Sequence, residues 1–372
     1  MNTETDYDII IIGGGIGGCA AALRGAQNGM RLLLITGSRA SHRRSRSQWV
    51  HNIDNMIGLN DGVITDQVRT SLEKAGFGPA AAHIAGEHYH FNNRRIIDNT
   101  LQRLERHYAA WTTILRGDAT GLVRTPDGFG VETEEGIARS PAVVLATGIM
   151  DEQPHFEIID RSGQGHGSLR SIYPFANRGV ALYCIRCEGH LTRNDPVAVI
   201  GHSETAAQIA FMFHERYRNP VYLLGNGTAA ALTGTSQTLC EKYGIEIIPN
   251  AITRFVSAEV GQLCGVEFGG RPEIKVRFAL VALGTHRAYN DLARAVEAEL
   301  ASGDLPPEQR QVLIDYRGET SVRGLFAVGD LALRRDEPMM KQIYTAQEYA
   351  VRAVDSIDSR RRKAFREAAL AS

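Results

Sequence analysis

The sequence has little of what several classes of protein require. Its 372 residues contain 41 Lys and Arg against 42 Asp and Glu, a formal net charge of -1, so no excess of cations is present to neutralise a nucleic-acid backbone. It contains no run of about 18 uncharged apolar residues, and residues 1–8 are acidic rather than basic, unlike a secretory signal. We therefore expect a cytoplasmic, soluble protein that binds neither nucleic acid nor membrane.

Cysteine is also scarce. The five cysteines are too few and too scattered for a disulfide scaffold, and only Cys184 and Cys187 form a close pair. In a reducing compartment such a pair indicates metal or redox chemistry. Half of a zinc site is the competing interpretation, but no second Cys or Cys/His pair has suitable spacing, so we expect no metal. We interpret Cys19, Cys240 and Cys264 as small core residues.

The length favours two domains, and 38 glycines favour nucleotide binding. From residue 7 the chain reads YDIIIIGGGIGGCAAALRGAQNG, an apolar strand, a glycine turn and a helix that ends near Gly29. Gly13, Gly15 and Gly18 form G-x-G-x-x-G between strand and helix, where backbone amides and the helix dipole receive a pyrophosphate. A second strand over 31–35 ends in Thr36-Gly37, without the acidic residue that usually accepts ribose hydroxyls.

Later segments repeat this plan. Residues 141–148 predict another buried strand that ends in a small-residue turn, and 196–213 predict a strand, a glycine turn and a helix. Two further strands are expected at 279–284 and 324–330, before a closing helix from about Met340. The basic stretch 359–366 is interpreted as a solvated helix end or tail. The predicted fold class is α/β, with two three-layer, Rossmann-like nucleotide-binding domains.

The motifs GGGIGG, LITG, ATG, YCIRCEGH, VAVIGHSETA and GLFAVGD follow one another in this order. Together they resemble the low-molecular-weight, FAD-dependent thioredoxin reductases and their flavoprotein relatives, over nearly the whole chain. The resemblance implies a discontinuous FAD domain, 1–152 and 282–372, and an inserted pyridine-nucleotide-like domain, 153–281, that carries the CxxC. It also implies a homodimer and a disulfide substrate, either a thioredoxin-like protein or a small molecule.

The resemblance further assigns residues to the cofactor. The three glycines of the first motif would face the FAD pyrophosphate, Asn55 of HNIDN would line the flavin pocket, and Asp330 would bind the ribityl or phosphate region. Backbone amides at a helix N-terminus would cap the flavin ring. The complete set of expected FAD-binding residues is Gly13, Gly15, Gly18, Thr36, Asn55, Thr147, Gly148, Gly329, Asp330, Lys341, Gln342 and Ile343.

The cysteine pair can close a small disulfide loop and exchange with a substrate disulfide through a mixed disulfide. By similarity to the family, Cys187 is the partner of the flavin and Cys184 attacks the substrate. Where the family has an aspartate after the second cysteine, this chain has Glu188, with His190 two residues further. Either group could transfer protons to and from the thiols.

The second glycine motif departs from the pattern of a dinucleotide site. Ser203 replaces the middle glycine, so its Cβ obstructs the pyrophosphate. Residues 225–227, Gly-Asn-Gly, stand where NADPH-using relatives have arginines for the 2'-phosphate. We therefore expect that NADPH is not the electron donor.

Three hypotheses for electron transfer remain open. A protein donor such as ferredoxin could dock on the basic run Arg39, Arg43, Arg44 and Arg46, which could instead contact FAD phosphates. The protein could be a dithiol oxidase that passes electrons to oxygen. A second flavin could occupy the vacated cleft. We favour disulfide reduction with a donor other than NADPH, and a flavin-based redox sensor without turnover is the alternative from another class.

Overall fold

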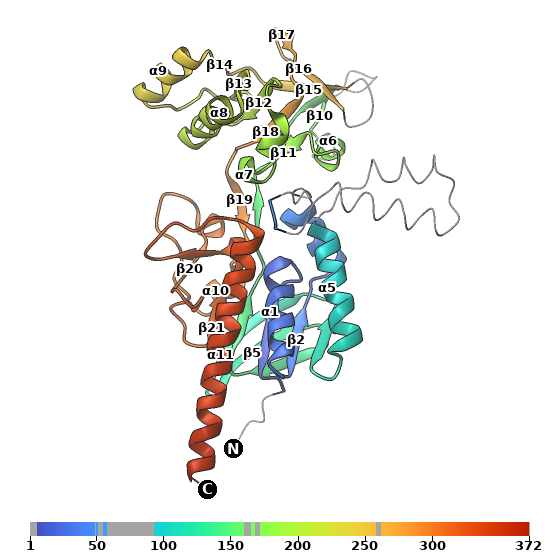
Figure 1. Ribbon diagram of the computed structural model, residues 1–372, viewed down its shortest axis with the longest axis vertical. Helices are drawn as coiled ribbons and strands as arrows, with labels where there is room; N and C mark the ends of the chain where they lie inside the picture. Colours follow the sequence, from blue (N-terminus) through green and yellow to red (C-terminus); the bar gives the residue numbers. More distant parts are fainter. Residues whose placement is uncertain are drawn as a thin grey trace, which may run out of the picture. The chain divides into compact units, whose positions relative to one another are not determined.

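The computed structural model describes residues 6–48, 50, 55–57, 93–159, 165–167, 172–257 and 262–371 (Figure 1). These residues divide into two compact units. The described part of unit 1 comprises 6–48, 94–150 and 285–371, and most of unit 2 lies within 151–284. The chain passes between the units at β8 (Ile149–Asp151) and β19 (Thr285–Ala288), which pair with each other.

The main sheet of unit 1 is parallel, with the strand order β21-β7-β1-β2-β3. Its central strands have the sequences IIII and LLLI, and every residue in them is buried. Continuous apolar runs are what a parallel strand needs when both faces of its sheet are covered. The strands are β1 (Ile9–Ile12), β2 (Leu32–Ile35), β3 (Thr112–Leu115), β7 (Val143–Leu145) and β21 (Leu325–Ala327).

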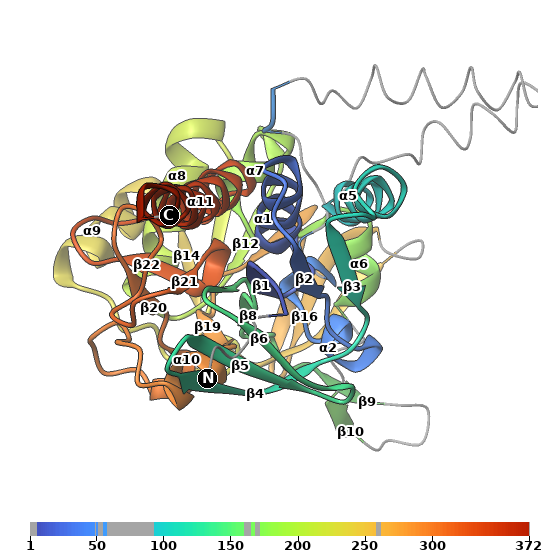
Figure 2. The same ribbon diagram turned by 90° about the horizontal axis from the view of Figure 1, so that it is seen from below.

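Three layers make up this unit. In Figures 1 and 2, α1 lies between α11 and α5 on one face of the sheet, and Figure 2 shows the antiparallel strands β4, β5 and β6 on the other. Arg24 of α1 forms a bidentate ion pair with Asp355 of α11, with Nε–Oδ1 2.7 Å and Nη2–Oδ2 3.0 Å. The elements are α1 (Ile16–Gln27), α5 (Asn93–His107), α11 (Ile343–Ala371), β4 (Ala119–Thr125), β5 (Gly128–Thr133) and β6 (Gly136–Ser140).

Unit 2 is built on the same plan. Its parallel sheet has the order β11-β18-β12-β13-β14, and the antiparallel strands β15, β16 and β17 form a second sheet. The main strands are β11 (Ala181–Leu182), β12 (Val197–Ile200), β13 (Val221–Leu224), β14 (Glu246–Ile248) and β18 (Phe278–Val281), and the helices after β12 and β13 are α8 (Glu204–Tyr217) and α9 (Gly234–Tyr243). The antiparallel strands are β15 (Ile252–Ser257), β16 (Leu263–Phe268) and β17 (Arg271–Ile274).

This repetition makes positions in the two units equivalent. In each unit a glycine follows the first strand directly and the helix N-cap comes two residues later, which pairs Gly13 with Gly201 and Gly15 with Ser203. The strands β7 and β18 both lead to a glycine with positive φ, +74° at Gly148 and +100° at Gly284. The two helix N-termini can therefore be compared residue by residue.

The predicted α/β class with two Rossmann-like units is confirmed. The closing helix begins at Ile343 and continues to Ala371, so the basic stretch 359–366 belongs to it. The two units meet in sequence at 150/151 and 284/285, close to the predicted boundaries at 152 and 282. No helix in the described part of the chain is long and apolar enough to cross a membrane.

Candidate functional site

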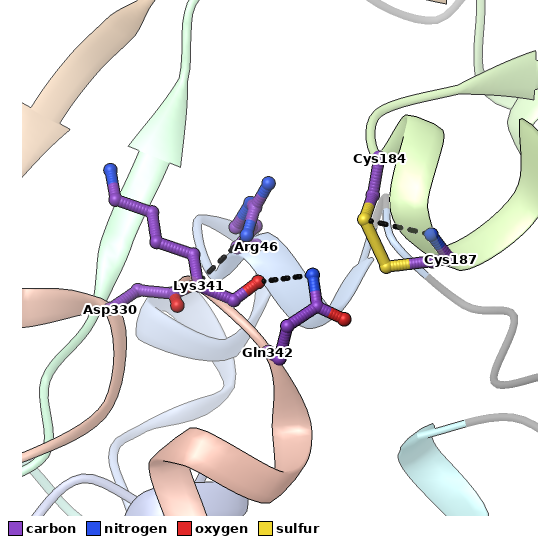
Figure 3. The surroundings of a disulfide bond; sticks show 6 residues. All are labelled: Arg46, Cys184, Cys187, Asp330, Lys341 and Gln342. Carbon is purple, nitrogen blue, oxygen red and sulfur yellow. Dashed lines mark hydrogen bonds and ion pairs between the residues drawn. A yellow bond between two sulfur atoms is a disulfide. The ribbon is translucent and has the colours of Figure 1, made fainter. Parts of the chain in front are cut away.

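The two close cysteines form a disulfide at the start of a short helix. Their sulfur atoms are bonded, their Cα atoms lie 5.3 Å apart, and Cys184 is the N-cap of α7 (Ile185–Glu188). The backbone amide of Cys187 donates to Cys184 Sγ at 3.2 Å, as Figure 3 shows. Amides of a helix N-terminus that point at a sulfur stabilise its thiolate form. Both cysteines are only partly buried.

Two groups beside the disulfide have different environments. Glu188, in the same turn as Cys187, is only 4% exposed, whereas His190 is exposed in the following 3-10 helix η3 (Gly189–Thr192). On the other side, Tyr183 is buried, and its hydroxyl donates to Gln153 Oε1 at 2.6 Å. This bond ties the cysteine loop to the segment that follows β8.

The first glycine motif forms the turn that a dinucleotide needs. Gly13 has φ +118°, and a Cβ on Gly18 would lie 1.8 Å from the carbonyl oxygen of Gly13, so helix and turn can approach only if residue 18 is glycine. Gly15, the N-cap of α1, has no side-chain cap, and a Cβ there would meet no atom within 4 Å. Uncapped amides that face open space at a helix N-terminus fit the pyrophosphate of FAD.

Two neighbouring strand ends complete this edge of unit 1. Thr36 follows β2, is 6% exposed, and its hydroxyl donates to Leu115 O at 3.3 Å. Thr147 follows β7, and its hydroxyl donates to Tyr289 O at 2.6 Å, with Gly148 next to it. The carboxyl ends of parallel strands meet at one edge of a sheet, so these residues share the edge with the glycine turn.

The GLFAVGD motif also reaches this edge, and it binds the basic run. Gly329, with φ +70°, begins the 3-10 helix η5 (Gly329–Leu331), and Asp330 Oδ2 accepts from Arg46 Nη1 at 2.8 Å (Figure 3). The side chains of Arg46 and Asp330 are only 18% and 23% exposed. Sequence reasoning missed this ion pair because its partners are 284 residues apart and no local pattern connects them.

Further contacts attach the basic run to the same edge. Its first helix, α2 (Arg39–Arg43), is capped by Ser38, and His42 Nε2 lies 2.9 Å from Thr36 O. The Tyr289 hydroxyl donates to Arg44 O at 2.5 Å. The run is therefore packed against the end of β2, the end of β7 and η5. This position favours a role in the cofactor site over a role as a separate docking arm.

The predicted flavin cap lies at the N-terminus of α11. Gln342 is buried, its side-chain amide donates to Lys341 O at 2.8 Å (Figure 3), and Ile343 is the first residue of the helix. The backbone amide of Gln342 donates to Met340 O at 3.1 Å, so this amide of the three is already used within the chain. Of the HNIDN stretch, only Asn55 lies within the described residues, where it is half-buried outside any helix or strand.

The equivalent helix N-terminus in unit 2 is closed. Ser203 caps α8, and its hydroxyl accepts from Ala206 N at 3.3 Å. The carboxylate of Glu204, in the first turn, accepts from Thr233 N at 3.1 Å and from the Ser236 hydroxyl. The hydrogen bond from Ser236 is the largest influence on Glu204 and lowers its pKa, so the carboxylate stays ionised at a position that would otherwise attract a phosphate.

The end of β13 carries no cation. Residues 225–234 contain no Lys or Arg, and Asn226 has structural bonds: it donates to His155 O at 3.3 Å and accepts from Ile252 N at 3.0 Å. The three other cysteines lie apart from this chemistry. Burial, with a contribution from Asp98, raises the pKa of Cys19 to about 12, which keeps it a thiol. In the described part of the chain, no group of three or more His, Cys, Asp or Glu could hold a metal ion.

Comparison with known proteins decides the family. The model of the family "Pyridine nucleotide-disulphide oxidoreductase" matches residues 7–350. The chain belongs to this family. Membership confirms the predicted resemblance and implies FAD as the bound cofactor, and it assigns the protein to the flavoprotein disulfide oxidoreductases.

Relatives and solved structures agree with this assignment. The chain is 24% identical over 329 residues to a Bacillus subtilis NADH dehydrogenase, covering 87% of this chain and 53% of the relative, and 24% identical over 336 residues to one component of the alkyl hydroperoxide reductase of Escherichia coli, covering 89% and 54%. It thus spans about half the length of these curated relatives. Thioredoxin reductases from Streptococcus pyogenes (TM-score 0.69, 17% identity, 94% and 96% covered) and Giardia duodenalis (0.68, 15%, 96% and 99%) share its fold.

Proposed function

We propose that this protein is an FAD-dependent thiol-disulfide oxidoreductase that reduces a disulfide of a protein or small molecule through Cys184 and Cys187, with a donor other than NADPH. Unit 1 would bind FAD and unit 2 would carry the cysteines. The observation that carries the proposal is the contrast between the two equivalent helix N-termini, one open at Gly15 and the other capped by Ser203, in a chain that retains a CxxC disulfide.

The residues of unit 1 fit FAD. The uncapped amides at the start of α1 would bind its pyrophosphate, and the segments that end in Gly148 and Asp330 would line the rest of the cofactor. Arg46, already paired with Asp330, would add a positive charge to this site. FAD, when bound, supplies a reversible acceptor and donor of an electron pair.

The cysteine loop supplies the sulfur chemistry. After reduction, the amide of Cys187 would stabilise negative charge on Cys184, which favours Cys184 as the thiolate that attacks a substrate disulfide. Glu188 lies in the same turn and is shielded from water, so it would hold the proton that one thiol releases or takes up. His190 is exposed and would exchange protons with solvent.

The nature of the donor follows from unit 2. A pyridine nucleotide would need the amides that Ser203 already caps, and its 2'-phosphate would need a cation in 225–234, which has none. Ferredoxin or a second flavin would need neither. Because the basic run is packed against the edge of unit 1, a ferredoxin site on these arginines would share its cations with FAD.

Anaerobic reductive titration tests the proposal. The wild-type holoprotein should take up one more electron pair from dithionite than the Cys187→Ser variant, because the disulfide is a second two-electron acceptor. NADPH should not bleach the flavin within seconds, whereas reduced ferredoxin should. Equal uptake by the two proteins would refute the role of the disulfide, and rapid bleaching by NADPH would refute the assignment of the donor.

A further inference from the structure

The surface around the disulfide is strongly basic. Arg186 stands between the two cysteines on the exposed side of α7, and His190 and Arg193 follow on and after η3. Arg216 and Arg218, at the end of α8, are also exposed. We call these five side chains the basic face. Within the described residues, none of its four arginines forms an ion pair.

The two parts of the basic face are adjacent because η3 is bonded to the end of α8. The side-chain amide of Asn219 donates to Asp195 O at 2.7 Å and to Thr192 O, and Asn194 N donates to Tyr217 O at 3.0 Å. These bonds lie on both sides of the segment that carries Arg193. The arginines on the end of α8 are therefore neighbours of those that follow the disulfide.

Carboxylates in this region do not cancel the charge. Asp195 lies 3.6 Å from Arg277, a further cation outside the basic face, and Glu215 accepts from the Tyr243 hydroxyl at 2.9 Å. Glu188 is buried beside the disulfide. The basic face thus keeps an excess of positive charge that its own unit does not neutralise.

Helix stability explains only part of this arrangement. A cation in the last turn of α8, such as Arg216, interacts favourably with the helix dipole. Arg186 is one residue before Cys187 in a helix of four residues, and Arg193 lies beyond η3, so neither has this structural reason. Leu191, between His190 and Arg193, is an exposed apolar side chain, 48% accessible. An apolar contact surrounded by unpaired cations is typical of a protein docking surface.

We infer that the basic face receives a protein whose disulfide is flanked by carboxylates, and that it selects this partner by charge. This inference rests on the proposed function of the cysteine pair. A thiolate of the reduced pair attacks the partner disulfide, one partner sulfur leaves as a thiolate, and the second cysteine then displaces the other. The Cys184–Cys187 disulfide forms again, and the partner gains the electron pair supplied by the reduced flavin and two protons from solvent.

The probe is a set of three oxidised peptides with the same CxxC core, flanked on both sides by Glu, Gln or Lys. Holoprotein reduced with dithionite is mixed with each peptide without air, and the initial rate of thiol formation is measured at low and high salt. We expect the Glu peptide to react about tenfold faster than the Gln peptide, and the Lys peptide to react slowest, with the differences disappearing at high salt.

Charge reversal locates the effect. The double variant Arg193→Glu/Arg216→Glu should lose the preference for the Glu peptide and gain rate with the Lys peptide, while retaining the wild-type rate with the Gln peptide. Arg124→Glu, an exposed arginine on β4 of unit 1, is the control and should behave as wild type. Arg186 is not changed, because its charge also acts on the thiolates.

Each alternative result has a distinct meaning. Equal rates for the three peptides, or a preference that persists in the double variant, would overturn the inference and leave the proposed function intact. If no peptide is reduced by wild-type protein that takes up the additional electron pair, the proposed disulfide reduction itself is wrong, and the inference falls with it.

Discussion

The substitution Gly15→Ser tests the cofactor site directly, because it would make the first helix N-terminus like the second. In α8, Ser203 accepts from the amide of Ala206, three residues along the chain. A serine at position 15 would accept from the amide of Gly18 in the same way. A Cβ at Gly15 meets no protein atom within 4 Å, so the folded chain can accommodate it.

The two expected effects have opposite signs. Serine is a slightly better N-cap than glycine, so the apo-protein should be unchanged or more stable by a few tenths of a kcal/mol. FAD would lose one hydrogen bond from an amide to its charged pyrophosphate, about 1.5 to 3 kcal/mol, and would meet the new side chain. At about 1.4 kcal/mol per factor of ten, the affinity for FAD should fall roughly ten- to hundredfold.

Flavin-fluorescence titration of the apo-protein measures the affinity, and thermal unfolding of the same sample measures the stability. Gly234→Ser is the matched control, because this glycine begins α9 in unit 2 and its Cβ would also meet no atom within 4 Å. The control should bind FAD like wild type. An unchanged affinity in Gly15→Ser would refute the placement of the pyrophosphate, and a destabilised apo-protein would refute the claim that the site is open.

Three further predictions concern other parts of the chain. Burial raises the pKa of Glu319, but the hydrogen bonds from Arg360 outweigh it and keep the pKa below its usual 4.5; a lowered folded-state pKa stabilises the protein above the unfolded pKa, so Glu319→Gln should cost about 1 to 2 kcal/mol at pH 7 in denaturant unfolding, a difference that disappears as the pH falls below about 4.5. Tyr183→Phe leaves Gln153 Oε1 buried without its donor and should cost about 1 to 2 kcal/mol in the same assay, and no loss would contradict the bond. Ser203→Gly should cost only a few tenths of a kcal/mol and should not make NADPH bleach the flavin, because the missing cations after β13 are not restored; stopped-flow absorbance checks this.

Much of the architecture follows from local patterns. The runs of residues 9–12 and 32–35 are apolar at every position, and such runs specify strands buried on both faces. The positions of Gly13, Gly15 and Gly18 indicate the nucleotide turn because only glycine permits the close contact between Gly18 and the Gly13 carbonyl. The three-residue spacing of Cys184 and Cys187 identifies the disulfide, since a single helical turn brings both sulfurs together.

Tertiary structure alone decided what surrounds these motifs. The ion pair of Arg46 with Asp330, the hydrogen bond of Tyr183 to Gln153, and the adjacency of Arg193 to the end of α8 join residues that are distant in the chain. Periodicity and spacing report only the neighbours of a residue within one helix, strand or turn. Charged and polar side chains on separate elements are brought together by the packing of the sheets and helices, so their partners become visible only in the folded protein.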